Sequence, residues 1–271
     1  TGVFTWSQGT LTGSGATHIA GAAVLEGSNK FSNGRSLQLA GETRWTGGEL
    51  YLSDGTVLHN LASGVFTMLT DSSITYQRTT LPTVINEGVI IKSGGAGTKS
   101  LYGQWTNSGV VRLQSGTVWL QHSYTQTGGE TVLEGGNLRN TNTLQLQGGV
   151  LRGRGVIQGA LNNRATVDIE PLGSMLQVTG AYVQQNSAAL VVALQSSDPI
   201  TGYDRLQIGG QATLSGTLTV ERPTGYTPAS AELFLILRLL IIGELYNPIL
   251  GLLLGNGSQL TPFYNANDLT L

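Results

Sequence analysis

The chain has 271 residues, of which 39 are glycine and 11% are charged, against roughly 25% charged residues in an average soluble domain. The net charge of −2 excludes the basic surface that nucleic-acid binding needs, and the absence of a Gly-x-y period excludes collagen. No cysteine is present, which excludes a disulfide-stapled domain; with a surface rich in Ser, Thr, Asn and Gln, this favours an extracellular or cell-surface bacterial protein.

A short sequence motif near the N-terminus recurs along the chain. Trp6-Ser-Gln-Gly-Thr-Leu11 matches Trp45-Thr-Gly-Gly-Glu-Leu50, and looser copies begin at Trp105 and Tyr124. No basic and apolar signal segment precedes Thr1. We therefore expect that a leader has been removed or that the parent chain is longer.

Glycines mark a regular period in the middle of the chain. Gly109, Gly129 and Gly149 are each 20 residues apart. The stretch Leu144–Leu161 alternates strand pieces of two to four residues with glycine corners, and glycine recurs too often for a helix to persist. Strands this short must stack on copies of themselves. The pattern predicts an all-β fold, a parallel β-helix (β-solenoid) with roughly 20 residues per coil.

Period-two alternation indicates which side chains face the core. The apolar members of each strand should point inward and the residues between them outward. The inward set is Leu37, Leu39, Leu50, Leu52, Val111, Leu113, Val118, Leu120, Leu144, Leu146, Val167 and Ile169. The outward set is Gln38, Tyr51, Arg112, Trp119, Gln145 and Asp168.

Three regions depart from this pattern. The segment 69–83 is expected to form a longer loop or an irregular coil, and the segment 195–203 a protruding loop. From Leu233 to Leu254 the chain is dense in Leu and Ile, but Arg238 and other polar or helix-breaking residues interrupt it, which favours buried coils or an interface over a membrane span. We expect a β-helix over 1–232, with 233–271 as apolar C-terminal coils of the same solenoid and a candidate subunit junction.

Several phrases resemble long bacterial surface proteins of the autotransporter and filamentous-haemagglutinin type and Gly-rich repeat exoproteins. They are Trp45-Thr-Gly-Gly-Glu-Leu-Tyr-Leu-Ser-Asp-Gly-Thr-Val-Leu-His-Asn60, Ile85-Asn-Glu-Gly-Val-Ile-Ile-Lys-Ser-Gly-Gly-Ala-Gly-Thr98, and the run of Val178–Gln184, Tyr203–Ile208 and Ala212–Val220. The resemblance covers about Thr5 to Leu237 and departs from the family pattern at Arg238–Leu254. It implies a right-handed parallel β-helix, export from the cell, and adhesive or scaffolding use, with no shared catalytic residues.

Two motifs imitate nucleotide-binding loops. Gly94-Gly-Ala-Gly-Thr-Lys-Ser100 lacks the glycine directly before the lysine and a following helix, both of which a phosphate-binding loop needs. Gly153-Arg-Gly155 is too short for a dinucleotide turn. Both are predicted to be solenoid corners, so we expect no cofactor.

The histidines are candidate metal ligands, and two carboxylates are candidate catalytic residues. His18, His59 and His122 show no ligand spacing, so no metal site is expected. Asp168 and Glu170 lie on one strand face, about 7 Å apart by strand geometry, which is compatible with glycoside cleavage. Arg152, Arg154 and Arg164 could stack near this pair, as a polysaccharide lyase requires. We favour the alternative that these charges keep an outer face soluble, and predict no catalytic residues.

Aromatic residues leave a further alternative open. Trp45, Trp105 and Tyr124 share one repeat position. If they face outward they form a sugar-binding stripe, and if they face inward they belong to the core.

The sequence therefore favours an extracellular structural or adhesive β-solenoid without enzymatic activity, with carbohydrate binding or cleavage as the alternative. Exposed strand edges and low charge favour head-to-tail stacking of copies into a fibre, so the chain itself and surface polysaccharide are the expected partners. The candidate self-association residues are Leu233, Leu235, Leu240, Ile242, Leu250, Leu253, Leu269 and Leu271.

Overall fold

The computed structural model describes residues 2–77, 80–242, 246, 248–254 and 257–271, and within them every regular element is a β-strand. The strands wind into parallel sheets stacked as a β-solenoid with roughly 21 residues per turn, which confirms the predicted fold class. A typical turn contributes one strand to each of three sheets, here called sheets A, B and C. The chain divides into two compact units, Thr1–Thr143 and Leu144–Leu271, and this division does not coincide with the expected boundary at residue 232.

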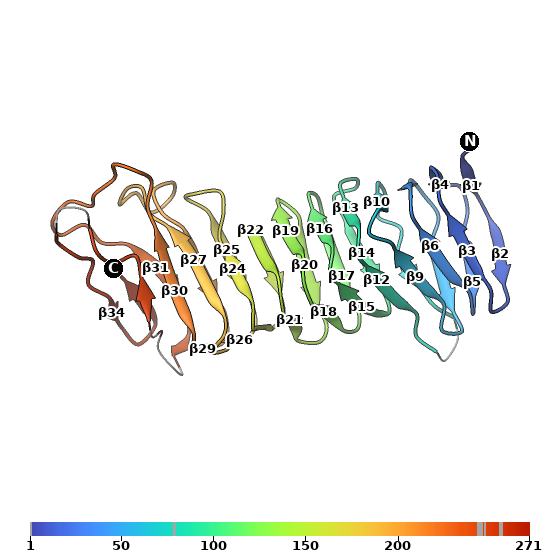
Figure 1. The fold of residues 1–271 in the computed structure, drawn as a ribbon. Coiled ribbons are helices and arrows are strands. Elements are labelled where there is room, and N and C mark those ends of the chain that lie inside the picture. The colour runs from blue at the N-terminus through green and yellow to red at the C-terminus, as the bar shows by residue number, and fades with distance from the viewer. Residues whose placement is uncertain (1, 78–79, 243–245, 247, 255–256) are drawn as a thin grey trace. The chain divides into compact units, whose positions relative to one another are not determined.

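In the first unit, neighbouring strands of each sheet pair in parallel and lie side by side from blue to green in Figure 1. Sheet A contains Phe4–Trp6 (β1), Ala23–Leu25 (β4), Glu42–Trp45 (β7), Val65–Met68 (β10), Val89–Lys92 (β13), Val110–Leu113 (β16) and Glu130–Glu134 (β19). Sheet B contains Gly9–Thr12 (β2), Lys30–Asn33 (β5), Leu50–Ser53 (β8), Ile74–Thr75 (β11), Thr98–Leu101 (β14), Thr117–Leu120 (β17) and Asn137–Asn140 (β20). Sheet C contains Ala16–Ile19 (β3), Ser36–Leu39 (β6), Val57–Asn60 (β9), Thr83–Asn86 (β12), Gln104–Asn107 (β15) and Tyr124–Gln126 (β18).

The second unit repeats this plan. Sheet A contains the first part of Val150–Gln158 (β22), then Thr166–Asp168 (β24), Ala189–Ala193 (β27), Thr217–Glu221 (β30) and Ile249–Leu250 (β33). Sheet B contains the second part of β22, then Met175–Val178 (β25), Arg205–Ile208 (β28) and Leu235–Arg238 (β31). Sheet C contains Leu144–Leu146 (β21), Leu161–Asn163 (β23), Tyr182–Gln184 (β26), Gln211–Leu214 (β29) and Ile241–Ile242 (β32).

Strand β22 bends from sheet A into sheet B at the Gly153-Arg-Gly155 motif. Both glycines have positive φ, 106° and 145°, a backbone region that side chains with a Cβ rarely enter. The motif is therefore a solenoid corner, as predicted.

The alternation of the strands places side chains as predicted. All twelve residues of the inward set are buried, and the six residues of the outward set are half-buried on the outer faces. Equivalent inward residues stack on successive turns, as in Leu144, Leu161, Tyr182 and Ala212. The core is thus a column of side chains inside each unit.

A buried amide ladder occupies the corner between sheets C and A in the first unit. Asn60 Nδ2 donates to Asn86 Oδ1 and Asn86 Nδ2 to Asn107 Oδ1, each at 2.7 Å. The same nitrogens reach the backbone oxygens of Val89 and Val110 at 3.1 Å. The ladder therefore ties successive turns together at this corner, both through its amide–amide bonds and through its bonds to the first residues of the sheet A strands.

The last segment reverses direction. Strand Asp268–Thr270 (β35) pairs antiparallel with β31 and with Phe263–Tyr264 (β34). Leu269 and Leu271 are buried. The chain therefore covers the edge of β31 with its own backbone.

Leu146→Asp should prevent folding of the second unit. Leu146 is fully buried, and an unpaired buried carboxylate costs several kcal/mol. The control is Gln145→Asp, because Gln145 is the outward neighbour in the same strand. Soluble yield and circular dichroism should separate the two variants, and a folded L146D chain would show that this register is wrong.

Candidate functional site

All three lysines of the chain, Lys30, Lys92 and Lys99, are buried at the corner between sheets A and B of the first unit. Lysine is almost never fully buried unless it is paired. Residues two positions apart on a strand point to the same face of the sheet. Lys92 therefore points inward with Ile90, and Lys99 points inward with Leu101. This cluster is the most unusual polar feature of the described residues.

Lys30 holds the corner between β4 and β5. Its Nζ donates to the backbone oxygens of Glu26 and Ser28, both at 2.8 Å, and of Gly47 at 2.7 Å. These bonds use all three ammonium donors. Burial lowers the pKa of Lys30, and Glu26 and Glu49 partly oppose that shift.

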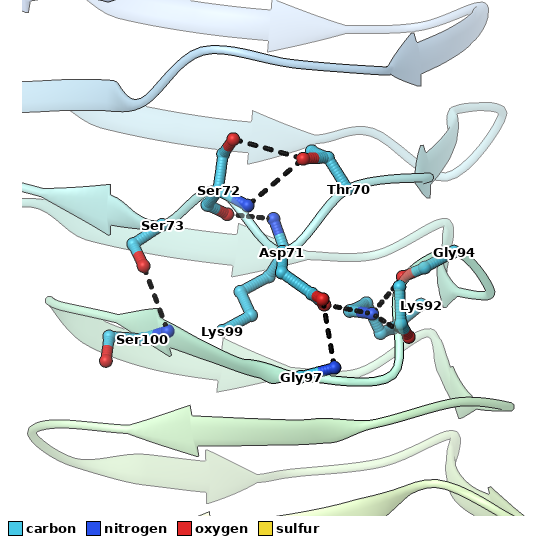
Figure 2. A network of polar contacts seen from close by, with 10 residues as sticks. Thr70, Asp71, Ser72, Ser73, Lys92, Gly94, Gly97, Lys99 and Ser100 are labelled. Carbon is cyan, nitrogen blue, oxygen red and sulfur yellow. Dashed lines mark hydrogen bonds and ion pairs between the residues drawn. The ribbon is translucent and has the colours of Figure 1, made fainter.

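Lys92 and Asp71 form an ion pair at the corner between β13 and β14 (Figure 2). Lys92 Nζ lies 3.1 Å from Asp71 Oδ1, and it also donates to the backbone oxygens of Gly94 and Gly95. Burial acts to raise the pKa of Asp71, but bonds from the Gly97 N–H and from Lys92 outweigh it and leave that pKa lowered. The carboxylate therefore stays ionised beside the buried ammonium group.

Lys99 lies deeper in the same corner. Its Nζ is 3.4 Å from the centroid of the Trp45 ring and donates to the backbone oxygen of Ser72. Burial, and then the charge of Lys92, lower the pKa of Lys99 to about 7, against the attraction of Glu49 and Asp71. The cation–π contact replaces part of the lost hydration.

The glycine run before Lys99 wraps the backbone around Asp71. The Gly97 N–H donates to Asp71 Oδ2 at 2.9 Å. A Cβ at Gly95 would come within 2.3 Å of the Asp71 carboxylate, and one at Gly97 within 2.8 Å. The Gly94–Ser100 motif is thus a corner that encloses an internal carboxylate, followed by β14 and not by a helix.

The lysine cluster is suited to stabilising the backbone at the corner and not to catalysis. Its ammonium groups contact backbone carbonyl oxygens, the Asp71 carboxylate and the Trp45 ring inside the core. The sequence analysis missed it. For Lys92 and Lys99 the available signal was a buried apolar residue two positions away on the same strand, Ile90 and Leu101. Lys30 has Ser28 and Ser32 at those positions and gave no such signal.

The three aromatic residues considered for a sugar-binding stripe are core residues. Trp45, Trp105 and Tyr124 are at most 4% exposed. Trp45 stacks on Phe66 at 6.1 Å, and the Tyr124 hydroxyl lies 2.6 Å from Thr131 Oγ1. The outward orientation is therefore wrong, because all three side chains point into the core. The three residues also do not share one repeat position, since Trp105 and Tyr124 are in register in sheet C and Trp45 lies in sheet A.

Other aromatic side chains do face outward, on or beside sheet B of the first unit. Phe31 and Tyr51 stack with centroids 4.7 Å apart. Tyr102 packs near Tyr76 at 5.7 Å and near His122 at 6.0 Å. All five are half-buried, and the sequence analysis did not assign a role to them.

The histidines are held in three different settings. His18 Nδ1 lies 3.3 Å from Gln38 Oε1, His59 Nε2 lies 3.1 Å from Glu87 Oε2, and His122 belongs to the aromatic group. Within the described part of the chain, no group of three or more His, Cys, Asp or Glu residues could hold a metal ion.

The carboxylates Asp168 and Glu170 differ in their surroundings. Glu170 Oε1 lies 3.8 Å from Arg152 Nη1. Burial and the nearby Glu221 raise the pKa of Asp168, whereas Arg152 opposes this shift. Asp204, which is fully buried, accepts bonds from the backbone N–H groups of Ser174 and of Ala193 at the end of β27. In the described part of the chain, the side chains of Arg154 and Arg164 form no ion pair with Asp168 or Glu170, unlike that of Arg152.

The candidate self-association residues fall into three groups. Leu233, Leu240, Leu250 and Leu253 are exposed. Leu235 is half-buried within β31, and Leu269 and Leu271 are buried against the chain's own strands, so these last two cannot supply a free surface. The side chain of Ile242 lies outside the described residues.

Among the residues described, no helix has the length and apolar character that crossing a lipid bilayer requires. No protein-family model matches the chain, and no curated protein matches it at a significant level of similarity.

The buried Lys99 predicts a stability that rises with pH. From about pH 7 to about pH 10 the unfolded chain binds a proton at Lys99 that the folded chain has released, so the free energy of unfolding increases by at most roughly 1.4 kcal/mol per pH unit. Lys99→Met should flatten this rise, as measured by urea unfolding across that range. Equal slopes for the variant and the unmodified chain would contradict the assignment.

Proposed function

We propose that the chain is an extracellular structural or adhesive β-solenoid of a bacterial surface, without a catalytic role. The observation that carries this proposal is the way in which outward side chains bond to side chains of the neighbouring turns. In the second unit, Asn162 Nδ2 donates to Gln145 Oε1 at 2.9 Å and Gln185 Nε2 donates to Asn162 Oδ1 at 3.1 Å. Such amide ladders make an ordered and uncharged outer face.

The buried polar groups support the same role. The amide ladder of Asn60, Asn86 and Asn107 and the corner lysines bond to backbone or to each other. These buried bonds connect neighbouring turns to one another, which limits their relative motion. A rigid solenoid with low surface charge suits a scaffold that presents a surface at a distance from the cell.

Export can be tested directly. Antibodies raised against the purified chain should label intact cells of the producing bacterium, and external protease should remove the label. Labelling that appears only after the cells are permeabilised would contradict the proposal.

Self-association is the second element of this proposal. Leu250 and Leu253 are 49% and 70% exposed, and low net charge removes the electrostatic barrier between copies. Because β35 covers the edge of β31, we expect a contact between copies to use the side chains of Leu250 and Leu253 and not that strand edge.

Sedimentation across a concentration series should show association of the unmodified chain. The double variant Leu250→Asp with Leu253→Asp should remain monomeric. Ile200→Asp is the matched control, because Ile200 is 72% exposed in a separate loop, and it should associate normally. A chain that stays monomeric at every concentration has no such junction.

A further inference from the structure

An open hollow lies on the outer side of the first unit, where β2 and β5 begin. It is lined by Gln8, Gly9, Ser28, Asn29 and Phe31. A Cβ placed on Gly9 would meet no atom within 4 Å, so the space beside Gly9 is open to solvent. None of the five lining residues is charged.

Phe31 forms an aromatic platform in this hollow. Its ring stacks on Tyr51 of the next turn, with an interplanar angle of 17°. Gln8 and Gly9 come from the preceding turn, because Gly9 is in register with Lys30 and Thr10 with Phe31. One face of the Phe31 ring is therefore covered by Tyr51, and the ring also forms part of the lining of the hollow.

Two amide side chains stand beside the platform. Asn29 Oδ1 accepts a bond from the Glu49 backbone N–H at 3.1 Å, which orients the amide and leaves its Nδ2–H donors for a ligand. Gln8 is exposed and adds a second amide, with both a donor and an acceptor.

The buried Lys30 fixes the wall that carries Asn29. Its ammonium group bonds to the backbone oxygens of Glu26, Ser28 and Gly47, so the corner is braced from inside the core. A site that is ordered before binding loses less entropy when a ligand arrives.

We propose that this hollow binds one pyranose ring of a neutral polysaccharide. A pyranose presents a flat C–H face that can pack on an aromatic ring and a rim of hydroxyls that can bond to amides, and ligand sites combine such apolar surface with a few placed polar groups. The uncharged lining favours a neutral sugar over an acidic one. The site goes beyond the scaffold role, and its test in solution does not depend on where the protein is located in the cell.

Titration calorimetry of the purified chain with cellohexaose, mannohexaose, chitohexaose and hexagalacturonate tests the site. At least one neutral hexasaccharide should bind. Phe31→Leu should weaken that binding at least about tenfold and Gln8→Ala by roughly threefold or more, the loss of a stacking platform and of a hydrogen bond. Phe31→Trp should retain binding.

Gln104→Ala is the matched control for Gln8→Ala, because Gln104 is an exposed glutamine on sheet C, and it should bind as the unmodified chain does. Circular dichroism verifies that each variant is folded. If Phe31→Leu does not fold, Gln8→Ala and Phe31→Trp decide the question. The proposal is overturned if no neutral hexasaccharide binds, if only hexagalacturonate binds, or if Gln8→Ala binds as tightly as Gln104→Ala.

Discussion

The constraint on which this structure depends is the hydrogen bonding of the backbone where each turn bends. Between corners, parallel pairing with the next turn satisfies the peptide groups. At a corner the chain leaves the sheet, and buried carbonyl oxygens need other donors. In the first unit, Lys30, Lys92 and Lys99 bond to such oxygens at one corner. At another corner, Asn60, Asn86 and Asn107 bond to one another and to carbonyl oxygens of the sheet A strands, which ties successive turns together. A buried donor of the right length is therefore as necessary here as the apolar core.

Lysine is a costly choice, since a buried ammonium group loses its hydration. The structure offsets this cost locally. Asp71 supplies a counter-charge to Lys92, the Trp45 ring lies against Lys99, and three carbonyl oxygens surround Lys30. Burial nevertheless lowers the pKa of Lys99 to about 7, so the offset is incomplete and we expect the stability of this corner to depend on pH.

The corner that Lys30 stabilises lies next to the hollow on the outer surface. Lys30 bonds to the Ser28 backbone from within, while Asn29 and Phe31 line the hollow outside. A side chain that stabilises the fold thus also orders a candidate binding surface. In the second unit, outward amides such as Asn162 bond between turns, so regular stacking orders the outer faces as well as the core.

The sequence by itself determined the solenoid, its period and the side of the strand to which residues such as Leu144, Leu146 and Gln145 point, because alternation and glycine corners are local properties. It left the direction of Trp45 open and gave no role to the lysines. Tertiary structure decided these points, since they depend on which residues meet across turns. The spacing between partners varies, from 26 residues for Asn60 and Asn86 to 21 for Asn86 and Asn107. A period of about 20 residues cannot predict such contacts, because each corner differs in length and only stacking sets the register.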